Sequence, residues 1–419
     1  MYSAVRALAA AAAPATAAAS AAWLVGTTVS ADSEVFSWGS NQYGQLGLGH
    51  EKDIFKPTKI DALSKHTIFN VTSGAASSAT ATISEDGSVF TFGCGKHNML
   101  GHGDGGDAPN QDSPRWVSGL PADCRVASIA VGGMHMLALD TTGTVWSWGA
   151  QGRASPVGRA GAASPGVPGK VGGALQGKDI VQVAAGRRHS VALTREGELY
   201  TWGGGHYGAL GHGSRKDCPE PTLVQGFRSP VIHVSAGSDH TVVLLADGKV
   251  FAFGSDEYGQ CGVGFKNRAE REPVQVSGFD GKPIVKVIAG EYHSLALAND
   301  GTVFAWGANK DGQLGTGDRT NAGTPRSVDG LLGLKVVDAA AGGHTVFLTD
   351  DNRVFVTGRG REGQLGRGDS LESVAAARLD PVEVHAISAA ATAAGMAGSP
   401  KVVGVTAGKL HSAALVSNE

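Results

Sequence analysis

The chain has 419 residues, of which 63 are glycine, with 17% charged residues and a formal net charge of −3. It contains no basic run, so we expect no DNA partner and do not expect nucleic acid as a primary ligand. The four cysteines have no C-x-x-C spacing, which argues against a disulfide framework and against a metal site. These are Cys94, Cys124, Cys218 and Cys261.

Residues 1–30 differ from the rest of the chain. They contain one cation, Arg6, long alanine tracts and no acidic residue. This composition is typical of a targeting segment, and we interpret it as a mitochondrial leader, with plastid and secretory leaders as alternatives. The stretch from Ala7 to Val29 is long enough to cross a bilayer, but alanine contributes little transfer free energy. Weak insertion into, or contact with, an inner membrane therefore stays open. We expect a mitochondrial protein of the matrix or the inner-membrane surface.

Residues 31–419 repeat one pattern, which predicts a single domain. A phrase of the type V-F-x-W-G occurs seven times, at intervals of 51 to 56 residues. Ten residues before most copies stands the histidine of a G-x-x-H phrase, and an Asp-Gly turn often separates the two. Asp-Gly between short alternating apolar runs is a strong hairpin signal. The copies of V-F-x-W-G begin at Val35, Val89, Val145, Leu199, Val250, Val303 and Val354.

Two further short apolar runs complete each unit, one after a proline (57–60, 221–224) and one alternating (180–183, 284–287). Four short strands per unit, without helical periodicity anywhere in the array, indicate the blades of a β-propeller. The last G-x-x-H element, residues 407–415, has no V-F-x-W-G after it, and the first V-F-x-W-G has no such element before it. We therefore predict an all-β, seven-bladed β-propeller in which N- and C-terminal strands share one blade and close the ring.

These phrases resemble the repeats of the regulator of chromosome condensation family. The resemblance rests on G-x-x-H-S-x-A-L, D-G-x-V-F-x-W-G and N-x-x-G-Q-L-G, and it covers residues 33–419. It implies the propeller fold. It does not imply one activity, because this propeller hosts exchange factors, ubiquitin-ligase accessory domains, photoreceptors and organelle assembly factors. Mitochondrial members of the family look like assembly factors.

Six histidines occupy the same position of the repeat, and Ala79 occupies it in the remaining unit. A catalytic histidine is needed once, with a partner that orients it, whereas six copies around a ring predict a repeated architectural hydrogen bond, for instance to backbone groups between blades. Equivalent positions on neighbouring blades are too far apart to share a zinc ion. We expect no catalytic residue, no metal and no cofactor, and hence no enzyme. The histidines are His135, His189, His240, His293, His344 and His411.

An aromatic residue also recurs once per unit, and we expect it to pack in the core, with Thr357 as a weak point where it replaces the aromatic ring. The recurring residues are Trp38, Phe92, Trp148, Trp202, Phe253 and Trp306. The repeat breaks in the third unit, which lacks N-x-x-G-Q-L-G, and at residues 387–401 in the seventh. We predict flexible loops at 153–178 and 387–401 that bind partners, with tolerated surface variation as the alternative.

The main functional hypothesis is a non-catalytic mitochondrial interaction scaffold. Its partners would be proteins of a respiratory-chain complex or of the mitochondrial ribosome, whose assembly it would support. The alternative is nucleotide exchange on, or regulation of, a small or organelle GTPase. In that hypothesis Asp239 and His344 would face the GTPase, because Ser238-Asp239-His240 resembles the acidic phrase of the exchange factors. Gly342-Gly343-His344 resembles their histidine phrase with one residue fewer.

Overall fold

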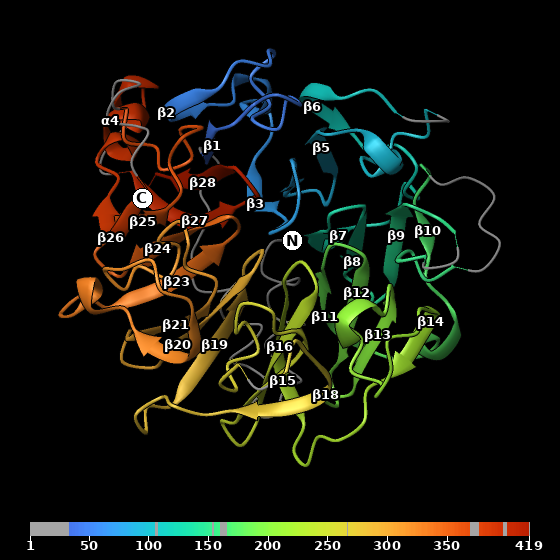
Figure 1. The fold of residues 1–419 in the computed structure, drawn as a ribbon. Helices are drawn as coiled ribbons and strands as arrows, with labels where there is room; N and C mark the ends of the chain where they lie inside the picture. Colours follow the sequence, from blue (N-terminus) through green and yellow to red (C-terminus); the bar gives the residue numbers. More distant parts are fainter. Residues whose placement is uncertain are drawn as a thin grey trace.

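Seven four-stranded antiparallel sheets surround a central axis in the computed structural model (Figure 1). It describes residues 33–104, 108–152, 155–159, 166–265, 267–368, 377–396 and 400–418. The leader predicted at residues 1–30 lies outside the described residues. Blades are numbered here by their V-F-x-W-G strand, so blade 1 contains Val35 and blade 7 contains Val354.

The strands recur in the same order in every blade, from the axis outward. The innermost strands are β27 (Lys401–Ala407), β3 (Ile68–Ser73), β7 (Val126–Val131), β11 (Ile180–Ala185), β15 (Val231–Ala236), β19 (Ile284–Ala289) and β23 (Val336–Ala341). The second strands are β28 (His411–Ser417), β4 (Ala79–Ser84), β8 (His135–Asp140), β12 (His189–Thr194), β16 (His240–Leu245), β20 (His293–Ala298) and β24 (His344–Thr349).

The V-F-x-W-G phrases form the third strands, and the outermost strands follow them. The third strands are β1 (Glu34–Gly39), β5 (Val89–Gly93), β9 (Val145–Gly149), β13 (Leu199–Gly203), β17 (Val250–Ser255), β21 (Val303–Gly307) and β25 (Val354–Gly358). The outermost are β2 (Ile54–Lys59), β6 (Gln111–Trp116), β10 (Gly169–Lys170), β14 (Cys218–Leu223), β18 (Ala269–Val276), β22 (Ala322–Ser327) and β26 (Arg378–Glu383). In blade 3, where the repeat breaks, β10 has only two residues.

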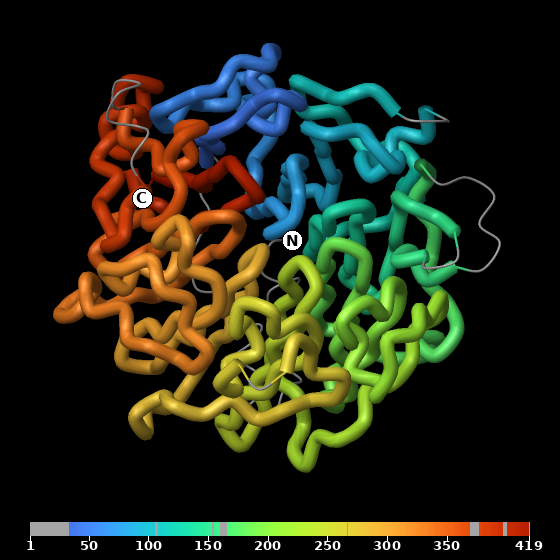
Figure 2. The backbone as a smooth tube through the Cα atoms, viewed as in Figure 1, coloured from blue at the N-terminus to red at the C-terminus, as the bar shows by residue number. Residues whose placement is uncertain are grey.

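The ring closes within blade 1, as predicted. Its strand order is β2-β1-β28-β27, and β1 pairs with β28 from Glu34 opposite Val416 to Gly39 opposite His411. In Figure 2 the blue start of the described chain and its red end accordingly lie side by side in one blade. The fold class predicted from the repeats is confirmed.

The absence of helix predicted for the array is wrong at one place. Where the sequence suggested a flexible insert, residues 386–393 form helix α4 (Ala386–Ala393). Alanine has the highest helix propensity, and Ile387 and Ala391, four residues apart, bury the same helix face. The helix contacts β2, the outer edge of blade 1. Short 3₁₀ turns also occur at η1 (Asp61–Leu63), η2 (Lys96–Asn98), η3 (Gly173–Leu175), η4 (His206–Gly208) and η5 (Asp329–Leu331).

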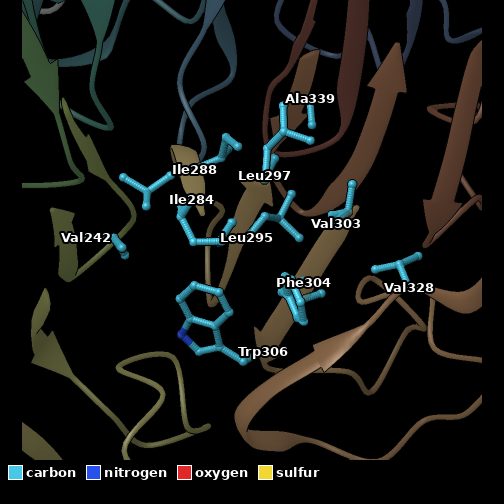
Figure 3. Packing of buried hydrophobic residues seen from close by; sticks show 14 of the residues in the cluster. Val242, Ile284, Ile288, Leu295, Leu297, Val303, Phe304, Trp306, Val328 and Ala339 are labelled. Carbon is cyan, nitrogen blue, oxygen red and sulfur yellow. The ribbon is translucent and has the colours of Figure 1, made fainter. Parts of the chain in front are cut away.

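The core lies between blades, where the recurring aromatic residues are buried. Figure 3 shows Trp306 and Phe304 of β21 packed with Leu295 and Leu297 of β20, in a cluster that includes Val242 of blade 5 and Ala339 of blade 7. Each recurring tryptophan also donates its indole N–H to a backbone carbonyl of the preceding blade. These bonds are Trp38 to Gln364 (2.9 Å), Trp148 to Met99 (2.9 Å), Trp202 to Pro156 (2.7 Å) and Trp306 to Gln260 (2.9 Å).

Thr357 replaces this aromatic residue in blade 7 without leaving its hydroxyl unpaired. The buried hydroxyl lies 2.9 Å from the carbonyl of Gly312 and 2.7 Å from that of Arg378, and so can donate to either. Its methyl group faces Gly315, beside Pro381. Polar contacts thus replace part of the packing that tryptophan supplies elsewhere.

Candidate functional site: the G-x-x-H face

The loops that precede the second strands and the loops that follow the third strands lie on one face of the disc. Each second strand starts where the third strand ends; His189, for example, pairs with Gly203. The G-x-x-H loops, such as residues 186–189, therefore lie beside the loops that follow V-F-x-W-G, such as residues 204–217. We call this side the G-x-x-H face.

The six repeated histidines lie beneath this face, at most 1% exposed, and each links its blade to the next. Each Nε2 forms a hydrogen bond with the hydroxyl of the serine or threonine that follows the histidine position in the next blade. The pairs are His135 with Ser190 (2.7 Å), His189 with Thr241 (3.0 Å), His240 with Ser294 (3.0 Å), His293 with Thr345 (2.8 Å), His344 with Ser412 (2.6 Å) and His411 with Thr80 (2.9 Å). The partner is a side-chain hydroxyl, whereas we suggested backbone groups.

The hydroxyls carry the link on to the backbone. Ser294, for instance, donates to the carbonyl of Gln260, 2.8 Å away, in the Gln260-Cys261-Gly262 loop of the preceding blade. The glycine of G-x-x-H is needed because the ring packs on it: a Cβ at Gly186 would lie 2.1 Å from Cε1 of His189. Histidine, glycine and hydroxyl therefore form one structural unit.

Burial keeps these imidazoles neutral. Desolvation lowers the pKa of His135, His240, His344 and His411 to about 3, and that of His189 and His293 to about 4. A neutral imidazole held between a glycine and a hydroxyl has no access to a substrate. Chemistry at this face would need other side chains.

The junction between blades 2 and 3 is built differently. Ala79 stands in place of the histidine, and Met136 stands in place of the hydroxyl that would receive it. Both are fully buried in one apolar cluster with Trp148 and Leu100. Because both polar partners are replaced together, neither is left unsatisfied.

A chain of backbone hydrogen bonds joins the G-x-x-H loops from blade to blade. Five inner-loop N–H groups donate to the corresponding loop of the next blade, and Lys409 donates to blade 2. The bonds run from Gly133 to Gly186 (3.1 Å), Arg187 to Ser238 (2.9 Å), Ser238 to Glu291 (3.2 Å), Glu291 to Gly342 (2.9 Å), Gly343 to Gly408 (3.3 Å) and Lys409 to Ser77 (3.0 Å). Among the described residues these bonds form a hydrogen-bonded rim across six of the seven junctions, and none joins the loop of blade 2 to that of blade 3.

Of the two residues in the GTPase hypothesis, the structure brings only Asp239 to the surface. Asp239 is partly exposed, and the Ser238 hydroxyl donates to its carboxylate at 3.2 Å. His344 is fully buried and bonded to Ser412.

Sequence reasoning missed a second group on the same rim, formed by Glu291, Tyr292 and Lys409. Lys409 and Glu291 form an ion pair at 3.4 Å. Burial raises the pKa of Glu291, and burial together with the Glu291 carboxylate raises that of Tyr292 to about 12. The Tyr292 ring packs edge-on against Tyr258, with centroids 5.6 Å apart. Glu291, Tyr292 and Lys409 each occupy an x position of G-x-x-H, where the repeat pattern carries no signal of its own.

The two segments predicted to bind partners are described only in part. Residues 153–154, 160–165 and 397–399 lie outside the described residues. Between them, Arg159 donates to the carbonyl of Val167 at 3.2 Å, and burial lowers its pKa. Among the described residues, no three His, Cys, Asp or Glu side chains gather closely enough to hold a metal ion. In the same part of the chain no helix has the length and apolar character needed to cross a bilayer.

A closed seven-bladed ring with a histidine–hydroxyl link at six junctions defines a repeat-type β-propeller. The chain belongs to the RCC1-like propeller family: the family model for the RCC1-like domain matches residues 105–419, and that for the regulator of chromosome condensation (RCC1) repeat matches residues 32–81. The resemblance stated from the sequence is confirmed at the level of the family.

Individual relatives differ in what they are. The ultraviolet-B receptor UVR8 of Arabidopsis thaliana is 36% identical over 342 residues, covering 81% of this chain and 76% of the receptor. The mitochondrial RCC1 domain-containing protein RUG3 of the same plant is 29% identical over 415 residues, 92% of this chain and 88% of RUG3. The human E3 ubiquitin-protein ligase HERC2 is 33% identical, but this chain spans only 7% of its length.

Two solved structures share the fold. Yeast RCC1 (Prp20), solved bound to Kap60, superposes with a TM-score of 0.79 at 22% identity, covering 93% of this chain and 89% of that one. Human WBSCR16 superposes with a TM-score of 0.78 at 23% identity, covering 92% and 99%.

Proposed function

We propose that this protein is a non-catalytic interaction scaffold of mitochondria, which supports assembly of a respiratory-chain complex or of the mitochondrial ribosome. The observation that carries the proposal is the hydrogen-bonded rim of the G-x-x-H face, on which variable side chains such as Tyr207 and Arg188 stand on fixed loops. A surface held in one shape binds a partner without paying for its own ordering.

Two further observations support it. The repeated histidines, the residues most suggestive of catalysis, are buried, neutral and committed to hydroxyl partners. The leader-like composition of residues 1–30 agrees with the mitochondrial relative RUG3, which matches this chain over most of its length.

The test is purification of the tagged full chain from mitochondria, followed by mass spectrometry. We expect respiratory-chain subunits or mitochondrial ribosomal proteins to co-purify in stoichiometric amounts. A reporter fused to residues 1–32 should enter mitochondria. A reporter that stays in the cytosol would overturn the proposal. So would a purified protein that itself turns over a substrate.

The second candidate is regulation of a GTPase, favoured by the partly exposed Asp239 on the same rim. This function predicts one GTPase that binds best when nucleotide-free and is released by GTP. Asp239→Ala should then reduce nucleotide release, whereas it should leave the partners of a scaffold in place. The Asp239 carbonyl accepts from the Ser255 N–H at 2.7 Å, a backbone bond that alanine keeps, so the variant should fold normally.

A further inference from the structure

The loop that follows the third strand of blade 4 differs from its counterparts. It reads Gly203-Gly204-Gly205-His206-Tyr207-Gly208, so glycines replace the polar residues that stand at Ser40 and Asn41 in blade 1. Gly204 donates its N–H to the Arg188 carbonyl at 2.7 Å. Ser40 and Ser255 make the same backbone bond in other blades, and at Gly204 a Cβ would lie 3.1 Å from Cβ of Arg188, so this arginine borders the loop.

Three more cations border the same loop. A Cβ at Gly205 would lie 2.0 Å from the Lys216 carbonyl oxygen and 3.1 Å from the carbonyl carbon of Arg215. A Cβ at Gly208 would lie 2.6 Å from Cα of Arg271, which comes from blade 5. We call Arg188, Arg215, Lys216 and Arg271, with Tyr207 among them, the blade-4 patch; all five side chains are exposed.

These four cations differ from the arginines that form ion pairs elsewhere on the protein. Arg115, Arg195, Arg326 and Arg353 each lie within 2.9 Å of a carboxylate. Within the described part of the chain, no carboxylate lies at ion-pair distance from any of the four patch cations. Three acidic groups lie nearby: Asp217 accepts from the Gly205 N–H (3.0 Å), Glu270 accepts from Asn267 (2.9 Å), and Glu272 lies beside Gly213.

Tyr207 is slightly more exposed than Tyr258, which occupies the same loop position in blade 5 and is 37% exposed. Tyr207 is 41% exposed and has a left-handed backbone, with φ of 57°, which holds it at the top of the loop. The corresponding Tyr43 has the Lys96 ammonium 5.9 Å from its ring, and Tyr258 packs against Tyr292. An exposed ring on a loop bordered by arginines has the composition of a binding hot spot.

We propose that the blade-4 patch binds an acidic segment of a partner protein. Three guanidinium groups present planar forks that match carboxylates, and the Tyr207 ring supplies apolar contact between them. RNA is less well matched, because the chain as a whole carries a net charge of −3 and only Tyr207 and the neighbouring His206 offer rings for stacking. This inference rests on the scaffold function and adds the chemistry of the partner.

The test measures fluorescence anisotropy of a labelled glutamate-rich peptide titrated with the full chain. We expect binding that weakens as salt is raised, and no binding of the matched glutamine-rich peptide. Arg188→Gln combined with Arg271→Gln should weaken binding at least about tenfold, equivalent to about 1.4 kcal/mol. Within the described part of the chain neither side chain makes a hydrogen bond, so thermal unfolding should be unchanged.

The matched control is Arg115→Gln with Arg326→Gln, which removes the same charge from ion-paired sites in other blades. An equal loss in this control would show that net charge alone is read and would overturn the site. Tighter binding of a single-stranded RNA of equal charge, lost in Tyr207→Ala but not in Tyr207→Phe, would overturn the choice of an acidic protein.

The same variants separate this inference from the function on which it rests. If purification of the Arg188/Arg271 variant from mitochondria retains all assembly partners, the scaffold function stands and the patch is not its docking site. If the unaltered chain captures no such partners but still binds the acidic peptide specifically, the patch stands and the assembly role fails.

Discussion

Lys409 in blade 1 forms its ion pair with Glu291 in blade 6, so the contact passes over blade 7. The G-x-x-H loop of blade 7 has one residue fewer than the others, reading Gly342-Gly343-His344. A Cβ at Gly343 would lie only 3.7 Å from the Glu291 carboxylate. A longer blade-7 loop would therefore occupy the space through which Glu291 reaches Lys409. The shortened phrase therefore has a structural meaning of its own.

A double-mutant cycle on Glu291→Gln and Lys409→Met should give a coupling free energy of about 0.5 to 1 kcal/mol in urea unfolding. We expect a modest value because the Lys409 side chain is half exposed, although that of Glu291 is 12% exposed. The control cycle is Lys335 with Asp350, 4.0 Å apart and both about half exposed, which should show coupling near zero. Equal coupling in both cycles would contradict a special role for the rim pair.

The histidine–hydroxyl links should be individually measurable. Thr241→Val keeps the shape of a fully buried side chain but removes the partner of His189, and it should destabilise the protein by about 1 to 3 kcal/mol. Met136→Leu, at the junction that has no such link, should cost less than about 1.5 kcal/mol. Calorimetry or urea unfolding measures both. A Thr241 variant as stable as the parent would mean that the links do not stabilise the ring.

Acid should destabilise the ring through the same histidines. Their pKa is lowered to about 3 or 4 in the folded protein, against an ordinary value of 6.5 in the unfolded chain. Between these values the unfolded chain binds more protons, so stability is fully present above about pH 6.5 and is lost as pH falls towards 4. His293→Gln should reduce this loss by about 1.4 kcal/mol for each pH unit. A pH dependence unchanged in the variant would contradict the assignment.

Asp256 should titrate in the opposite direction. It is 1% exposed, and its Oδ1 accepts from Cys261 N–H at 2.8 Å while Oδ2 has no partner. At the corresponding place, Asn309 accepts from Leu314 and donates to the Asp318 carbonyl. Burial, aided by the Glu270 carboxylate, raises the pKa of Asp256 to about 6.

Because the folded protein holds this proton more tightly, stability falls as pH rises from about 4 to about 6. Asp256→Asn should therefore match the parent below about pH 4 and exceed it by on the order of 3 kcal/mol above pH 6. The reverse change, Asn309→Asp, should destabilise blade 6 at neutral pH. Unfolding curves recorded across this range check both. Identical curves for Asp256→Asn and the parent at pH 7 would contradict the raised pKa.

The fold was predictable because each blade repeats the same local sequence signals for strands and turns. The Asp-Gly turns, the alternating runs and the unpaired elements at residues 35 and 407–415 define strands and closure without any long-range information. Helix α4 was not predictable in the same way, because its eight residues offer only Ile387 and Ala391 as a periodic signal.

The links at the G-x-x-H face were half predictable. The repeated histidines predicted a repeated hydrogen bond. The sequence also held a signal for its partner, because serine or threonine follows the histidine position in six units and Met136 appears one blade after Ala79. Reading the pattern with a shift of one blade would have paired them. The contact between Glu291 and Lys409 has no such signal, since it depends on the short loop of blade 7 that lies between them.

The pairing of β1 with β28 also constrains when the ring can form. Blades 2 to 7 are each built from consecutive residues, so they can assemble as the chain emerges from the ribosome. Blade 1 cannot assemble in this way, because β27 and β28 are synthesised after all the other strands, whereas β1 and β2 are synthesised first. During synthesis the ring therefore stays open, with two exposed edges, until its final strands are available.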